Sequence, residues 1–143
     1  MIIAYSQDDE TNKLAVLVSS GELSVEKLLE KTISSSRPYS IMESLDIDDY
    51  FYDAYEYKDK KIILNISKAK DIHLNNFRKV RTAILQQLDV DFLRAVEIDN
   101  KQKQKEISVK KMALRDVTLT PLPETPDEIK KIWPSILGTN PYI

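Results

Sequence analysis

The sequence contains no cysteine, only two glycines and a single histidine among its 143 residues. Without cysteine, the chain cannot form a disulfide, a zinc ribbon, an iron–sulfur centre or a thiol nucleophile. Two glycines are too few for a phosphate-binding loop or a dinucleotide-binding fingerprint. One histidine cannot by itself form a histidine-based metal site. We therefore expect no cofactor, no metal and no enzymatic activity.

Long apolar runs and a strong excess of one charge are also missing. No apolar run approaches the ~20 residues of a membrane span. The first ten residues lack the basic start and long apolar segment of a signal peptide. Lysine and arginine number 21 against 23 acidic residues, so the net charge of −2 gives no global attraction for nucleic acid or an anionic membrane. We expect a cytoplasmic protein without a membrane partner.

The most regular part of the sequence is the stretch from Ser67 to Thr118, which contains no proline and no glycine. Its apolar residues recur at helical spacing, and the polar run at 99–102 interrupts them. We predict two antiparallel helices, Ser67–Ile98 and Lys101–Val117, with Ser67 as the N-cap of the first. The apolar residues that define the first helical face are Ala69, Phe77, Val80 and Ile84.

Further along the first helix, Leu85, Phe92 and Val96 lie nearly opposite that face at 100° per residue. Either the helix breaks at Asp89, or one long helix packs against different partners along its length. In the second case Phe92, Val96 and nearby Met112 contribute to self-association or to binding a protein partner. The alternative is that the N-terminal β-hairpins cover these residues within the same chain.

The remaining sequence predicts an α+β protein with a β-rich N-terminal region, a helical hairpin and a short C-terminal helix. Residues 1–66 form the first region, 67–137 contain the helices, and 138–143 are a tail. The helix that follows Thr125 begins with a capping-box pattern, with Pro126 at N1 and Glu128 at N3, and carries Ile132 and Trp133. In the N-terminal region we predict a first hairpin of strands 1–6 and 14–18, followed by a helix 25–32 with Leu28 and Leu29 facing inward. A loop 34–38 and a strand 39–42 come next, and a second hairpin of strands 54–57 and 62–66 ends the region.

Three polar features of the sequence could suggest a metal site, a catalytic base or a nucleic-acid-binding surface. The acidic residues Asp46, Asp48, Asp49 and Asp53 lack the glycine of a calcium-binding loop, so they indicate a solvated turn or a helix start. His73 has no neighbouring nucleophile in the sequence and is assigned a structural role, at the surface or half-buried. Acidic residues interrupt the basic residues of both long helices, which is typical of solvated helix faces rather than of a nucleic-acid site.

One set of motifs carries a family resemblance. Arg78 and Arg81 precede a Leu88-Asp89 pair, an Ala-Leu-Arg-Asp sequence ends at Asp116, and Trp133 is followed by proline. In this order the motifs resemble small prophage-encoded proteins of the phage tail assembly chaperone and tail-fibre assembly group. The resemblance covers residues 62–137. The chain departs from that group in having valine after Asp89, where tryptophan is typical, and in lacking a proline after Arg115-Asp116.

The resemblance implies a non-enzymatic phage or prophage morphogenesis protein in the bacterial cytoplasm that binds or chaperones a tail or tail-fibre protein. It also implies structural roles for the motif residues. An arginine paired with Asp89 or Asp116 would fix the register of the hairpin, and Trp133 would dock on it. Two alternatives are a structural subunit of the tail or fibre, which would be virion-associated, and a small regulatory or nucleic-acid-binding protein.

Overall fold

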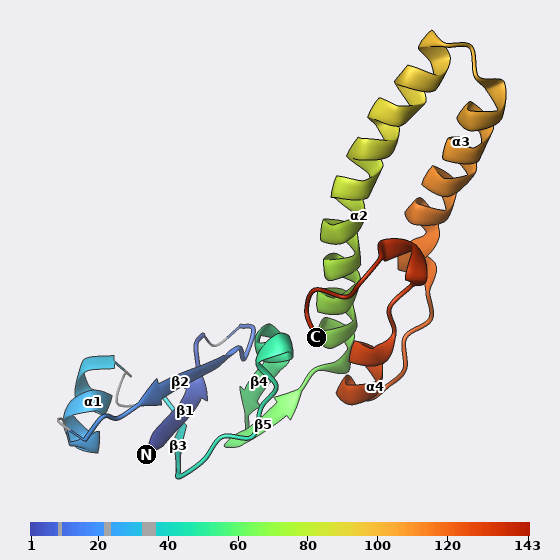
Figure 1. Ribbon diagram of the computed structural model, residues 1–143. Helices are drawn as coiled ribbons and strands as arrows, with labels where there is room; N and C mark the ends of the chain where they lie inside the picture. Colours follow the sequence, from blue (N-terminus) through green and yellow to red (C-terminus); the bar gives the residue numbers. More distant parts are fainter. Residues whose placement is uncertain (9, 22–23, 33–36) are drawn as a thin grey trace. The chain divides into compact units, whose positions relative to one another are not determined.

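The computed structural model describes residues 1–143 except 9, 22–23 and 33–36. The chain forms two compact units, Met1–Ala69 and Lys70–Ile143. Strands dominate the first unit, and a helical hairpin with a short C-terminal helix forms the second (Figure 1). The α+β class predicted from the sequence is therefore confirmed.

The first unit contains a three-stranded antiparallel sheet with β1 (Ile2–Ser6) between β2 (Leu14–Val18) and β3 (Tyr39–Met42). The first predicted hairpin is confirmed, with Ile3 opposite Leu17. The predicted helix is also present as α1 (Val25–Thr32), although Leu28 and Leu29 are only half-buried. Residues 34–36 of the predicted loop lie outside the described residues.

The second hairpin of this unit joins β4 (Tyr55–Lys58) to β5 (Lys61–Leu64). Asp59 and Lys60 between them have φ of 52° and 60°, the left-handed conformation that a tight two-residue hairpin turn requires. A 3₁₀ segment, η1 (Asp49–Ala54), precedes the hairpin. The core of this unit combines both strand pairs through the buried residues Ala4, Leu14 and Tyr57.

The long helix α2 (Ile66–Glu97) begins one residue earlier than predicted. Its N-cap is Asn65 rather than Ser67, because the Lys68 backbone N–H donates to Asn65 Oδ1 at 3.1 Å. This start also shortens the strand predicted for 62–66. The second helix, α3 (Lys101–Arg115), is capped by Asn100, whose side chain accepts from the Lys103 backbone N–H. Both helices end one or two residues before the predicted positions, and Val117 lies instead in η2 (Asp116–Leu119).

Helix α2 continues through Asp89 without a break, and its buried face does not change sides. The core that α2 shares with α3 includes Phe77, Leu88 and Ala95 on the first helix and Ile107 and Leu114 on the second. Phe77 and Leu88 are eleven residues apart, which is three helical turns to within about 20°. The predicted change of face was therefore wrong: Leu88 and Ala95 continue the original face.

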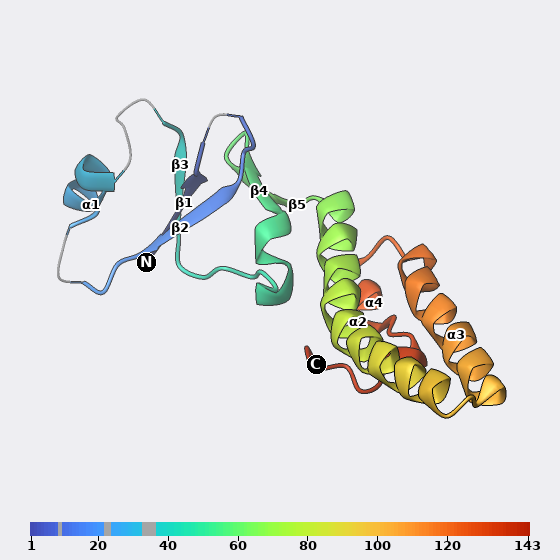
Figure 2. The same cartoon turned by 90° about the horizontal axis from the view of Figure 1, so that it is seen from above.

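The C-terminal segment packs on the hairpin near the start of α2. It contains α4 (Pro126–Lys131) and η3 (Ser135–Leu137). Thr125 and Pro126 occupy the predicted N-cap and N1 positions, but the Thr125 hydroxyl donates to the Glu128 carboxylate (2.7 Å) and makes no bond to the helix backbone. The helix ends before Ile132 and Trp133, which were predicted to belong to it. Figures 1 and 2 show this segment beside part of the hairpin, while the connection between α2 and α3 projects beyond it.

Candidate functional site

Trp133 joins the C-terminal segment to α2, as the sequence motif implied. Its ring lies edge-to-face with Phe77 at 5.2 Å between centroids, and Tyr142 contacts it from the tail at 6.1 Å. The indole Nε1–H donates to the Gly138 carbonyl at 3.0 Å. Trp133 is thus the centre of an aromatic cluster that holds the end of the chain against the hairpin.

The arginine–carboxylate pair expected across the hairpin is replaced by two other contacts. The Arg81 guanidinium donates to the backbone carbonyl of Arg115 at 2.9 Å, at the C-terminal end of α3, where a helix dipole favours a cation. Asp89 forms an ion pair with Lys111. Among the described residues, no contact joins either motif arginine to Asp89 or Asp116. The antiparallel register explains this, because it places Lys111 beside Asp89.

The other motif residues act locally. Arg78 donates to the Asn75 side chain on its own helix. Asp116 is the C-cap of α3, where its backbone N–H donates to the Met112 carbonyl, and the Arg115 side chain is exposed. Asp116 and Arg115 therefore lie at the end of α3, whereas the contact of Arg78 stays within α2.

His73 is fully buried rather than at the surface or half-buried. Its Nε2–H donates to the Ile132 carbonyl at 2.7 Å, and its ring packs against Phe77 and Trp133. Burial lowers the pKa of His73 below its ordinary value, and the hydrogen bond to Ile132 opposes that shift. The predicted structural role stands, because the ring is enclosed in the aromatic cluster and uses Nε2 to hold the C-terminal segment.

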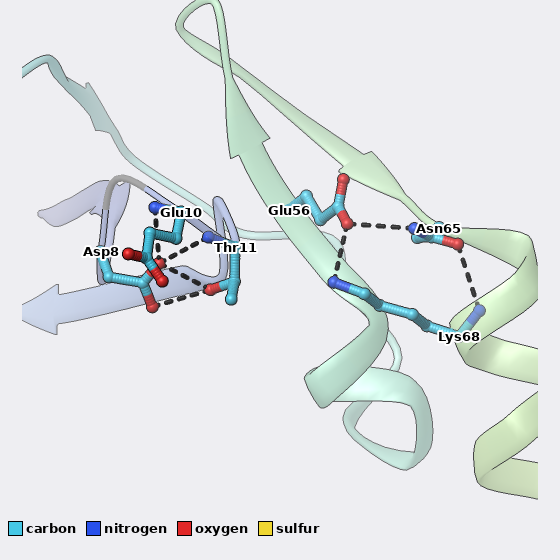
Figure 3. Close-up of polar contacts among 6 residues, drawn as sticks. All are labelled: Asp8, Glu10, Thr11, Glu56, Asn65 and Lys68. Carbon is cyan, nitrogen blue, oxygen red and sulfur yellow. Dashed lines mark hydrogen bonds and ion pairs between the residues drawn. The ribbon is translucent and has the colours of Figure 1, made fainter.

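Two polar clusters in the first unit are also structural (Figure 3). Glu56 accepts from the Lys68 ammonium at 2.8 Å and from the Asn65 side chain at 3.0 Å. The Lys68 contact and then the Asn65 contact lower the pKa of Glu56. Asp8 accepts from the Thr11 backbone N–H and hydroxyl, which lower the pKa of the Asp8 carboxyl. The first cluster ties the start of α2 to β4, and the second closes the β1–β2 turn.

The acidic stretch before β4 contributes a helix start, as expected. Asp48 caps η1 by accepting from the Tyr50 backbone N–H at 3.0 Å, and Asp53 pairs with Lys13 at 3.0 Å. Within the described part of the chain, no three histidine, cysteine or acidic side chains lie close enough together to hold a metal ion. These carboxylates are therefore occupied with local structure.

The three predicted partner-binding residues lie on the distal hairpin, but they do not share one side of it. The Lys111 ammonium lies 5.7 Å from the centroid of the half-buried Phe92 ring. Val96 follows Phe92 by one helical turn and is 48% exposed, and Met112 follows Lys111 and is 62% exposed. We call the apolar side of α2 that contains Leu85, Phe92 and Val96 the Phe92 face. Met112 lies about 160° around α3 from the buried Leu114 and so on the outer side of that helix.

The opposite side of the hairpin has a different character. A hollow of about 280 Å³ lies there between the two helices. Charged residues line most of the hollow. An ion pair within α2, Arg94–Asp91, and one within α3, Lys103–Glu106, lie beside it. Its lining residues are Leu88, Asp91, Lys103, Glu106, Ile107 and Lys110. The Phe92 face is therefore the more apolar of the two surfaces.

The chain matches no protein-family model, no curated protein and no solved structure. Among the described residues, no helix has both the length and the apolar character needed to cross a membrane. Exposed apolar side chains of the distal hairpin include Val90, Leu93, Val96 and Met112.

Some of the important contacts had no clear signal in the sequence. The partnership of Asp89 with Lys111 depends on the hairpin register, which no local pattern fixes. The cap at Asn65 could have been predicted, because asparagine is a preferred N-cap residue. It was missed because the strand predicted for 62–66 included Asn65. The buried state of His73 depends on the C-terminal segment, which is 59 residues away at Ile132.

Proposed function

We propose that the chain is a non-enzymatic phage or prophage morphogenesis protein that binds a tail or tail-fibre protein during assembly. The observation that carries the proposal is the exposed apolar surface of the distal hairpin. Val90 and Leu93 on the outer side of α2 are 43% and 63% exposed, and Val96 on the Phe92 face and Met112 on the outer side of α3 are also exposed. Exposed apolar side chains gathered on one element are typical of protein interfaces.

The motif residues support this proposal through the framework that they form. Trp133, Arg81 and Asp89 each make a contact that fixes the hairpin or its C-terminal segment. A hairpin held in this way presents its distal half with little loss of conformational freedom on binding, which favours affinity. The same motifs carry the resemblance to the tail assembly chaperones, so one set of residues supports both the scaffold and the function.

The test is co-purification with any tail or tail-fibre proteins that the neighbouring genes encode. Each candidate is co-expressed with the tagged chain, and the complex is measured by size-exclusion chromatography and by titration calorimetry. We expect one of them to bind, and we expect the double variant Val90→Ser, Leu93→Ser to weaken binding by about tenfold or more.

The control is Val18→Ser, which removes a valine that is 72% exposed from β2 in the first unit. Binding should be unchanged in this control. A gene neighbourhood without tail genes, or no binding to any neighbouring tail protein, would contradict the proposal. Recovery of the chain in purified particles would instead assign it to the virion as a structural subunit.

A further inference from the structure

We draw no further inference here: the strongest candidate, the Phe92 face on the distal half of α2, carries no proposal because nothing in the structure shows what covers it, and the charged residues beside it, Asp89 and Lys111, already pair with each other.

Discussion

Replacement of Phe77 by alanine tests the aromatic cluster on which the second unit depends. The ring is completely buried in the shared core of α2 and α3. Its centroid lies 4.8 Å from that of His73 and 5.2 Å from that of Trp133, both in edge-to-face geometry. The substitution therefore removes apolar burial and two ring contacts at once.

The size of the effect follows from these contacts. Truncating a buried phenylalanine to alanine costs about 3–5 kcal/mol, including the cavity that remains. Each aromatic pair accounts for about 0.5–1.5 kcal/mol of the loss beyond burial alone. Since Phe77 makes two such contacts, we expect a value in the upper part of that range, around 4–5 kcal/mol. Phe77→Leu keeps most of the volume and should cost about 1–2 kcal/mol.

Urea unfolding measures this loss, and the chain provides its own probe. Trp133 is the only tryptophan, and it lies within the cluster, so its fluorescence reports on this unit alone. Circular dichroism at the helical minimum gives a second signal. Leu93→Ala, at an exposed position of the same helix, is the control and should change stability by less than about 0.5 kcal/mol. A Phe77→Ala loss below about 1.5 kcal/mol would refute the assignment of this ring to the core.

Three further predictions concern single positions. Burial lowers the pKa of His73 in the folded chain, so the unfolded chain binds a proton there more readily. The second unit should therefore lose stability as the pH falls below about 6.5, by at most about 1.4 kcal/mol per pH unit. Urea melts between pH 7.5 and 5.5 measure this, and stability that holds or rises toward pH 5.5 would contradict it. Asn65→Ala removes the N-cap of α2 and should destabilise the chain by about 0.5–2 kcal/mol in thermal melts, whereas Ser67→Ala should cost much less. Equal losses for the two variants would contradict the assignment of Asn65 as the cap. Ile84→Asp puts a charge against the core and should cost about 3 kcal/mol or more, whereas Gln86→Asp on the exposed side should melt like the wild type. If Ile84→Asp and Gln86→Asp had the same melting temperature, the assignment of Ile84 to the buried face would be wrong.

Much of the fold follows from local patterns in the sequence. The two strands of the first hairpin, helix α1, strand β3 and both long helices agree with prediction to within one or two residues. Strong signals explain this success. A long stretch without glycine or proline favours helix, and short runs of β-branched residues between polar turns favour strands.

The buried face of α2 was only partly predictable, for a geometric reason. Leu88 and Ala95 are separated from Phe77 and Ile84 by eleven residues each, a spacing that preserves the face over three turns. Leu85 and Phe92 lie at the flank of that face and drew attention as a second stripe. Both side chains are half-buried because they pack against the edge of the core between α2 and α3.

Long-range contacts account for what local patterns could not give. His73 is buried because Ile132 and Trp133 return to it from the end of the chain. Lys111 is one of many lysines in the sequence, and only the register of the antiparallel helices selects it as the partner of Asp89. The sequence grouped Phe92, Val96 and Met112 as one surface, but Met112 lies on the outer side of α3, because Leu114 two residues later is buried.

The most direct measurement for the proposed function is the effect of deleting this gene on phage particles. Particles are purified from the deletion strain and from a strain that expresses the chain again from a plasmid, then counted by electron microscopy and analysed by mass spectrometry. If the chain is an assembly factor, particles without the gene lack tails or tail fibres, expression of the chain restores them, and complete particles do not contain the chain. Complete, infectious particles in the absence of the gene would contradict the account.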